Sequence, residues 1–351
     1  MDYSNAAEVS VMGQDDVRVT GSGVTVCIAN QKGGVGKTTT AVSLAAGLAL
    51  LGARVLVIDL DPQGNASTGL GCRVEEGDPS TYGVLVDGDA VADAVRPTEV
   101  DGLWLLPSSL DLAGAEVELV PAFSREMRLR RALEPVVAHY DIILIDCPPS
   151  LGLLTINALV AADQVLVPIQ CEYYALEGLS QLMRTVELVS DNLNRELELG
   201  GVVLTMFDGR TNLAQQVVDE VRAYFGARAY QTVIPRTVRL SEAPSFGQPI
   251  TTFDPSSRGA RSYQRLAREV AERLALPVSH DEMSALDRLL GDNDQAKASP
   301  QVPPGSNGTV RSVDGADDAP VVEPTADDVP VVEPPADDVP VVEPPEQEVR
   351  P

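Results

Sequence analysis

The sequence predicts an α/β fold with a mostly parallel, twisted sheet and helices on both of its faces. Short β-branched runs alternate with longer segments of helical periodicity, an order typical of βαβ units with right-handed crossovers. Apolar residues make up 44% of the chain but aromatic residues only 4%, so the core is expected to consist of Val, Leu, Ile and Ala. That composition suits parallel strands that are buried on both faces.

The strand pattern and the helical pattern each recur along the chain. The expected strands are 24–29, 54–59, 103–106, 141–146, 164–168 and 201–206. The expected helices are 38–51, 124–138, 175–193, 211–224 and 260–275. Such strands between helices indicate βαβ units.

The chain divides into a leader, one folded domain and a tail. Residues 1–22 are polar, acidic and without periodicity, so we expect a flexible leader. The folded domain is expected to span 23–280. The tail, 281–351, begins with a weakly helical piece over 281–290 and is otherwise expected to be disordered, acidic and rich in proline.

Three tandem ten-residue units fill 316–345 of this tail, each of the form A-D-D-x-P-V-V-E-P-x. Their prolines forbid a helix and their acidic side chains repel one another, which favours an extended, disordered segment. The repeats are interpreted either as a solvating spacer or as a docking arm in which V-V-E is the repeated contact.

The net charge restricts the classes of partner. A formal net charge of −26 argues against nucleic acid unless a local basic patch exists. No stretch of 18 apolar residues and no signal pattern occur, so we expect a cytoplasmic protein with no membrane partner. The four cysteines form no C-x-x-C pair and are interpreted as reduced, mostly buried thiols.

The strongest motif is K-G-G-V-G-K-T-T at 32–39, which follows an expected strand and opens an expected helix. This is the context of a phosphate-binding loop, because glycines let successive N–H groups face an anion and the helix N-terminus adds a favourable dipole. Lys37 is expected to reach the β- and γ-phosphates, and the Thr38 hydroxyl to bind Mg²⁺. The predicted nucleotide contacts are Gly33, Gly34, Val35, Gly36, Lys37, Thr38 and Thr39.

The loop departs from the general pattern at one position. A glycine is usual five residues before the Gly-Lys pair, but this chain has Gln31 there, followed by an additional lysine, Lys32. A lysine at that point is poorly aimed at its own phosphates, yet it could reach a nucleotide held by a second copy of the chain. The sequence therefore hints at a dimer that encloses two ATP molecules.

Three aspartates end expected strands or follow them closely. Asp59 and Asp61 lie in D-L-D-P-Q-G-N, and Asp146 ends I-I-L-I-D. Because the carboxyl ends of parallel strands face the ligand crevice, Asp61 is the candidate that orients an attacking water, and Asp59 is a candidate for the metal shell. Asp146 fits the Walker B pattern, whose carboxylate holds Mg²⁺ through water.

These motifs together resemble the deviant-Walker-A ATPases and, within them, the ParA/Soj family. The similarity covers about residues 24–275 and extends through I-D-C-P-P-S-L-G-L-L-T-I-N-A-L, Q-C-E-Y-Y-A-L-E-G, L-T-M-F-D-G-R-T-N-L and I-P-R-T-V-R-L-S-E-A-P-S. It implies a P-loop NTPase fold with ATP and Mg²⁺ as cofactors. It also implies an ATP-dependent homodimer on non-specific double-stranded DNA, slow hydrolysis stimulated by a ParB-type centromere-binding protein, and a nucleoid-associated role in chromosome or plasmid segregation.

The resemblance also assigns roles to single residues. Lys32 is similar to the family's signature lysine, which contacts the partner's nucleotide, and Asp61 to its hydrolytic aspartate. These two are the predicted catalytic residues. Met206, Pro235 and Arg236 are similar to the contacts beside the adenine.

Arg210 and Arg239 are similar to arginines that contact DNA in Soj-like proteins. Residues 236–273 hold seven arginines against four acidic residues, and Arg261, Arg265 and Arg268 share one face of an expected helix. That face is interpreted either as a phosphate-binding patch or as a solvated surface paired with glutamates. Phosphate contacts alone would give non-specific, salt-dependent binding.

Four other classes remain as alternatives. A MinD-like membrane ATPase needs a C-terminal amphipathic helix, whereas this C-terminus is acidic and proline-rich. An iron–sulfur carrier needs suitably placed cysteines, typically C-x-x-C. A carboxylate-activating ligase would use ATP with its substrate and without any effect of DNA. A nucleotide-binding scaffold without turnover is disfavoured by Asp61 together with Lys32.

Overall fold

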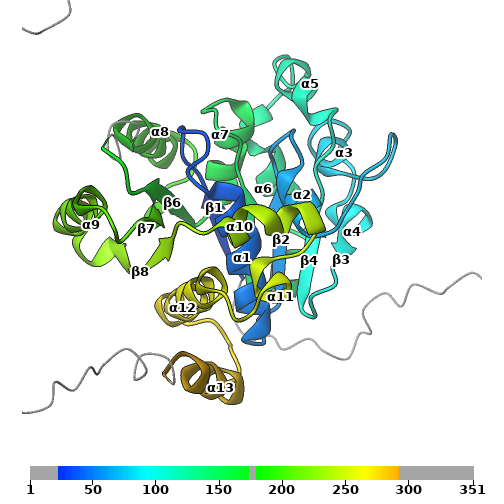
Figure 1. Cartoon of the computed structure of the whole chain (residues 1–351). Coiled ribbons are helices and arrows are strands. Elements are labelled where there is room, and N and C mark those ends of the chain that lie inside the picture. Colours follow the sequence, from blue (N-terminus) through cyan, green and yellow to red (C-terminus); the bar gives the residue numbers. More distant parts are fainter. Residues whose placement is uncertain (1–22, 174–178, 292–351) are drawn as a thin grey trace, which may run out of the picture. The chain divides into compact units, whose positions relative to one another are not determined.

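The computed structural model describes residues 23–173 and 179–291. At their centre lies an eight-stranded sheet of order β3-β4-β2-β5-β1-β6-β7-β8 (Figure 1). All neighbouring strands run parallel except β3 and β4, which pair antiparallel at one edge. The strands are β1 (Val24–Ile28), β2 (Val55–Asp59), β3 (Arg96–Pro97), β4 (Leu103–Leu106), β5 (Ile142–Asp146), β6 (Gln164–Gln170), β7 (Glu198–Phe207) and β8 (Ala229–Pro235).

Helices cover both faces of this sheet. The longer ones are α1 (Lys37–Leu50), α7 (Leu153–Ala161), α8 (Leu179–Asn192), α9 (Asn212–Phe225), α12 (Arg258–Arg273) and α13 (His280–Gly291). The shorter ones are α2 (Asn65–Gly69), α3 (Thr81–Val86), α4 (Val91–Ala94), α5 (Leu112–Glu118), α6 (Arg128–Leu133), α10 (Val238–Glu242) and α11 (Ile250–Phe253). Four 3₁₀ turns complete the described chain: η1 (Arg125–Met127), η2 (Val137–His139), η3 (Gly226–Arg228) and η4 (Ala243–Phe246).

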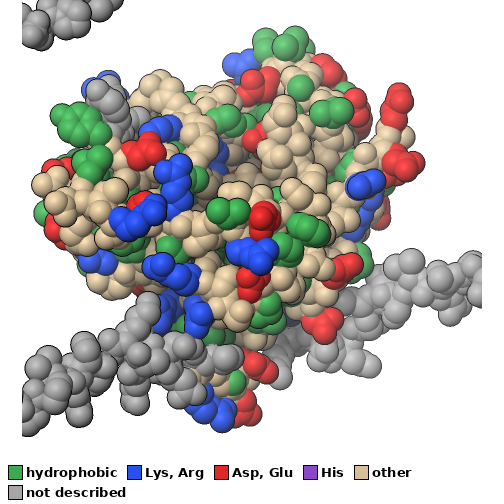
Figure 2. Space-filling view, in the orientation of Figure 1, with side chains coloured by type: hydrophobic (Ala, Val, Ile, Leu, Met, Phe, Trp, Pro, Cys, Tyr) green, Lys and Arg blue, Asp and Glu red, His purple; other side chains and the backbone are tan. Residues whose placement is uncertain are grey.

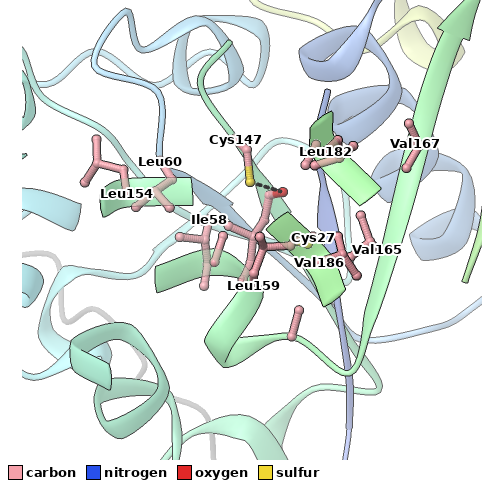
Figure 3. Packing of buried hydrophobic residues seen from close by; sticks show 14 of the residues in the cluster. Cys27, Ile58, Leu60, Cys147, Leu154, Leu159, Val165, Val167, Leu182 and Val186 are labelled. Carbon is pink, nitrogen blue, oxygen red and sulfur yellow. Dashed lines mark hydrogen bonds between the residues drawn. The ribbon is translucent and has the colours of Figure 1, made fainter. Parts of the chain in front are cut away.

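Two apolar cores follow from the period of two along each strand. Cys27 on β1 points to one face and packs with residues of α7 and α8, a part of the core that Figure 3 shows. Val26 and Ile28 point to the other face and pack with residues of α1 and α12. The central strands are buried on both faces, so the predicted α/β fold with helices on both faces is confirmed.

The six expected strands correspond to β1, β2, β4, β5, β6 and β7, whereas the edge strands β3 and β8 were not predicted. The prediction of one continuous helix over 124–138 is wrong. A 3₁₀ turn opens it, α6 ends at Leu133, and a second 3₁₀ turn follows. Pro135 explains the break, because proline disfavours the helical conformation in the residue before it and lacks an N–H.

The folded part continues beyond the predicted boundary at residue 280. Residues of the weakly helical piece 281–290, which was assigned to the tail, belong to α13, and Leu286 and Leu290 are buried in the second core. Residues 1–22 and the repeats at 316–345 lie outside the described residues, so the expectations about the leader and the repeats stay predictions. No helix in the described part of the chain is long and apolar enough to cross a membrane.

Helices α1 and α12 approach each other closely at one glycine. A Cβ atom added to Gly47 of α1 would lie 2.8 Å from the Cβ of Ala267 and 3.4 Å from the carbonyl oxygen of Tyr263 on α12. Ala267 and Tyr263 are both buried, so neither can move without disturbing the core. The contact therefore requires a residue without a side chain at Gly47.

We expect Gly47→Ala to destabilise the protein. Overpacking of about 1–3 kcal/mol should exceed the gain of about 1 kcal/mol in helix propensity. Gly114→Ala in α5 is the matched control, because its Cβ would meet only the flexible end of Glu118. Urea unfolding of both variants measures the difference, and a Gly47→Ala variant as stable as Gly114→Ala would contradict the tight contact.

Candidate nucleotide-binding site

The loop between β1 and α1 has the conformation expected of an anion cradle. Gly34 and Gly36 adopt left-handed backbone angles, with φ of 73° and 90°. Apart from the adjoining residues of the loop, no described atom lies within 4 Å of a Cβ built at Gly33 or Gly34, so this part of the loop faces open space. The loop is thus shaped by residues that tolerate positive φ, and it leaves room for a ligand beside its backbone.

Side chains from distant strands hold the loop in place. The Asn30 amide donates to the carbonyl of Pro168 on β6 at 2.8 Å, and the Asn30 side-chain oxygen accepts from the Lys32 N–H at 3.0 Å. On the other side, the Thr205 hydroxyl of β7 donates to the carbonyl of Val35 at 2.7 Å. These bonds fix both arms of the loop at the carboxyl ends of the central strands.

Lys37 lies buried at the start of α1. Its ammonium group is 3.4 Å from the Lys32 carbonyl oxygen, so it curls back over the loop. Burial lowers the pKa of Lys37, while the negative charge of Asp146 is the largest opposing influence. A buried ammonium group that points into a glycine loop is suited to bind phosphate oxygens.

Asp146 is fully buried at the end of β5, and neither carboxylate oxygen has a hydrogen-bond partner within the described residues. Burial raises the pKa of Asp146 well above its usual range, and its register partner Asp59 on β2 raises it further. The Thr38 side chain is close enough to favour the charged form in part, although no well-aligned hydrogen bond joins the two. Unsatisfied buried carboxylate oxygens call for an explanation, and a cation shell is one.

Asp59 is also buried, but its oxygens are occupied. One accepts from the Ser67 N–H at 2.8 Å and the Ser67 hydroxyl at 2.7 Å, and the other accepts from the Asp61 N–H at 3.2 Å. Burial raises the pKa of Asp59 to about 6 against these bonds. Asp59 therefore holds the loop after β2 and the start of α2. Its predicted role in the metal shell stays a prediction.

Asp61 lies in that held loop and is 8% exposed. One of its oxygens accepts from the Gln63 N–H at 3.0 Å, and Gly64 turns the chain with φ of 61°. The aspartates at 59, 61 and 146 are thus brought to the same edge of the sheet as the phosphate loop, as the strand ends predicted.

The donor set suits a cation that keeps water and phosphate ligands. The described residues contain no cluster of three or more His, Cys, Asp or Glu side chains arranged to hold a metal by themselves. Magnesium typically takes one or two carboxylates together with substrate phosphates and water. The Thr38 hydroxyl and the orphaned Asp146 carboxylate fit that role.

A pocket of about 430 Å³ opens beside the loop. It joins Gly36, Thr38 and Thr39 to Met206 and to the chain after β8. Its wall also includes Pro235, Arg236, Leu240, Gln248 and Tyr263. The predicted adenine-side residues therefore share one pocket with the loop, whereas Leu240, Gln248 and Tyr263 were not predicted.

Met206 occupies this wall with a left-handed backbone, φ 54°, which is costly for a residue with a side chain. Next to it, the Phe207 carbonyl accepts from the Arg236 N–H at 2.9 Å and joins the two sides of the pocket. Strain of this kind persists where the surrounding structure requires one conformation, commonly at a ligand site.

The Lys32 side chain is partly exposed and forms an ion pair outside the loop. Its ammonium group is 3.6 Å from the Glu172 carboxylate at the end of β6, and its side chain is 40% exposed. Exposed pairs of this kind contribute little to stability, so the lysine is available to another partner. This position is compatible with the predicted contact to a second copy of the chain.

The predicted DNA contacts are exposed and paired within the chain. Arg210 bonds to both oxygens of Asp208, at 2.9 and 2.6 Å, and holds the pKa of that carboxyl well below its usual range. Arg239 lies 3.0 Å from Glu242 and 3.3 Å from Asp254. Figure 2 shows further Lys and Arg side chains gathered over β8 and α12, the region of the predicted arginine face.

We expect Asp146→Asn to stabilise the nucleotide-free protein, and more so as pH rises. Because the folded-state pKa of Asp146 is raised, its favourable contribution is fully present below the unfolded value of about 3.9 and is lost as pH rises toward the folded value. Asparagine does not ionise, so the variant avoids the cost of burying a charged carboxylate at high pH. Urea unfolding without nucleotide, across a pH series upward from about 4, measures the difference from the wild type.

Asp191→Asn on the exposed surface of α8 is the control for net charge. A difference between Asp146→Asn and wild type that stays constant with pH would contradict the unfavourable burial of this carboxylate.

Comparison with known proteins places this site in a family. A family model described as an AAA domain matches residues 23–199. The chain is 59% identical over 249 residues to the sporulation initiation inhibitor protein Soj of Bacillus subtilis, a match that covers 71% of this chain and 98% of the relative. It is 55% identical over 248 residues to the chromosome partitioning protein ParA of Myxococcus xanthus, covering 71% and 88%.

A solved structure shares the fold. Cobyrinic acid a,c-diamide synthase from Mycobacterium smegmatis, with bound ADP and magnesium, superimposes with a TM-score of 0.64 and 36% identity over 73% of this chain and 99% of that one. The same enzyme has also been solved with an ATP analogue and magnesium, and ATP and Mg²⁺ are the cofactors that the sequence predicts for this loop. With such identity over nearly the full length of the Soj protein, and with the loop and its aspartates in place, this chain belongs to the ParA/Soj family of P-loop ATPases.

Proposed function

We propose that this chain is an ATP- and Mg²⁺-dependent ATPase that dimerises with ATP, binds DNA without sequence preference, and segregates a chromosome or plasmid with a ParB-type partner. The observation that carries the proposal is a preformed phosphate cradle that contains a second lysine, Lys32, whose side chain is 40% exposed and pairs with Glu172. The family relationship supports the segregation role, because several relatives, such as ParA of Myxococcus xanthus, are named for chromosome partitioning.

The residues divide the chemistry among them. The loop N–H groups and Lys37 bind the phosphates, and Thr38 with Asp146 holds the cation that neutralises them. Asp61, in a loop fixed by Asp59, orients the attacking water. The catalytic site needs Asp61 of one copy and Lys32 of the other, so it is complete only in the dimer. Hydrolysis is therefore slow and depends on dimerisation, and the ParB-type partner stimulates it.

The proposed DNA contacts are Arg210, after β7, and an arginine surface on α10, α12 and the residue that follows β8. The arginine surface comprises Arg236, Arg239, Arg258, Arg261, Arg265 and Arg268. Several of these arginines are held by acidic side chains of the same chain, such as Arg239 by Glu242 and Arg268 by Glu272. Phosphates must compete with these carboxylates, so one copy binds weakly and a dimer with twice the surface binds well. Nucleoid association follows from this binding.

A carboxylate-activating synthase is the second candidate, because the cobyrinic acid a,c-diamide synthase structure is 36% identical to this chain. The 55% identity to the chromosome partitioning protein ParA of Myxococcus xanthus favours partitioning. The two functions differ in what ATP use responds to: DNA and a partner protein in one case, a small carboxylic acid in the other.

We expect tight binding to non-specific duplex DNA with ATP, and little with ADP or no nucleotide. Binding with ATP should weaken steeply with salt, because phosphate contacts release counterions. Arg239→Glu should lose DNA binding while the ATP-dependent dimer persists. Fluorescence anisotropy of labelled DNA and light scattering measure the two properties separately.

Arg131→Glu on α6, exposed and outside the arginine surface, is the matched control for this charge change. No DNA binding by the wild type in any nucleotide state, with dimerisation intact, would remove DNA from the proposed function.

We expect Lys32→Ala to weaken the ATP-dependent dimer at least about tenfold, since a lost charge-assisted contact of about 1.5–3 kcal/mol corresponds to that change or more. Glu172→Gln is the matched control, because it removes the pair with Lys32 and leaves the lysine free to reach a partner. Sedimentation with a non-hydrolysable ATP analogue measures both variants. A Lys32→Ala dimer of wild-type affinity would rule out the trans role.

A further inference from the structure

A buried hydrogen bond joins α1, the helix that follows the phosphate loop, to α12, the helix that carries four of the six arginines of the arginine surface. The Thr40 hydroxyl of α1 lies 3.1 Å from the Tyr263 hydroxyl of α12, and either can donate. Both side chains are buried, with exposures of 0% and 1%. The bond spans 223 residues of sequence and sits in an interface otherwise lined by Gly47, Ala267 and other apolar residues.

The Thr40 end of this bond is part of the phosphate-loop structure. The Thr40 N–H donates to the Gly36 carbonyl at 2.9 Å, which is the first turn of α1 after the loop. Thr38 and Thr39, the two preceding residues, line the pocket, and so does the Tyr263 ring. The first turn of α1 is therefore bonded directly to Tyr263, without an intermediate residue.

At the other end of the bond, Tyr263 lies on the buried face of α12, the helix that carries four arginines of the arginine surface. Arg261 and Arg265 flank Tyr263 in sequence, on the part of α12 that faces away from the core. At the start of α12, a Cβ added to Gly259 would lie 2.9 Å from Leu240 of α10, so α10 and α12 fit together closely. Arg239, next to Leu240, also pairs with Asp254 just before α12. The two helices that carry these arginines, α10 and α12, thus pack directly against each other.

We propose that Tyr263 is a positioning residue, which through Thr40 makes the placement of the arginine surface depend on the ligand in the phosphate loop. The proposal rests on the proposed function, since it explains how ATP regulates DNA binding within each copy, in addition to dimerisation. A packed interface adopts discrete arrangements, and a buried directional bond selects between them. Burial also raises the pKa of Tyr263, so its hydroxyl keeps its proton at every working pH.

The test compares the full-length wild type with Tyr263→Phe. The affinity for non-specific duplex DNA is measured with the ATP analogue and with ADP, and the ratio of the two is the coupling factor. We expect Tyr263→Phe to lower this factor at least about fivefold, within the usual range of coupling between sites. By linkage, DNA should then increase the ratio of the affinity for the ATP analogue to the affinity for ADP less, by the same factor. A merely structural role would change stability and leave this reciprocal factor unchanged.

Tyr230→Phe is the matched control. Tyr230 is another buried tyrosine that packs near α12, where the Arg273 guanidinium lies 3.8 Å above its ring, but no described bond joins it to α1. Its coupling factor should equal that of the wild type. Thr40→Val, which removes the other hydroxyl, should reproduce the Tyr263→Phe effect, and the double variant should lose no more than either single one.

The outcomes separate the two proposals. A wild type whose DNA affinity does not respond to nucleotide overturns the proposed function itself. A wild type that responds, with Tyr263→Phe or Thr40→Val retaining the full coupling factor, overturns only the positioning role. If Tyr263→Phe folds poorly, Thr40→Val with Thr40→Ser as the hydroxyl-retaining control decides the question.

Discussion

Charge balance at the carboxyl ends of β2 and β5 constrains the rest of the site. Asp59 and Asp146 are buried register partners on adjacent strands, and Lys37 is buried above the same edge. Burial disfavours the charged form of each group, and only Asp59 has hydrogen-bond partners for both oxygens. In the proposed function, the negative charge of a polyphosphate balances Lys37 and the positive charge of its cation balances the two aspartates, so the cost of burying these groups favours that ligand.

The parallel sheet makes this arrangement possible, and the sequence could predict it because the relevant patterns are local. Apolar runs that end in aspartate identify β2 and β5, and a glycine loop between a strand and a helix identifies the cradle. Since parallel strands end at one edge, the meeting of these elements follows without any tertiary information. The edge strands β3 and β8 lacked such a signal, because the first has two residues and the second carries polar residues at its centre.

Tertiary relations were beyond prediction from local pattern. The pair between Arg239 and Glu242 follows from their i,i+3 spacing on α10, but the pair between Arg239 and Asp254 depends on how α10 packs, and no local charge spacing indicates it. The Thr40–Tyr263 bond joins residues 223 positions apart, and each looks like an ordinary helix residue in sequence. The pocket residues Met206, Pro235 and Arg236 were anticipated only through the family resemblance, whereas Leu240 and Tyr263 needed the fold.

The acidic character of the whole chain sets the range of ionic strength over which the proposed nucleotide control of DNA binding can act. The net charge of −26 repels DNA at long range, and only the local arginine surface opposes it. Because affinity falls with salt in proportion to the number of neutralised phosphates, doubling the surface in a dimer roughly doubles the salt slope as well as the contact count. At low salt one copy can already bind, and at high salt even the dimer releases DNA. Nucleotide control is therefore greatest in an intermediate range of ionic strength, where one surface is too weak and two are sufficient.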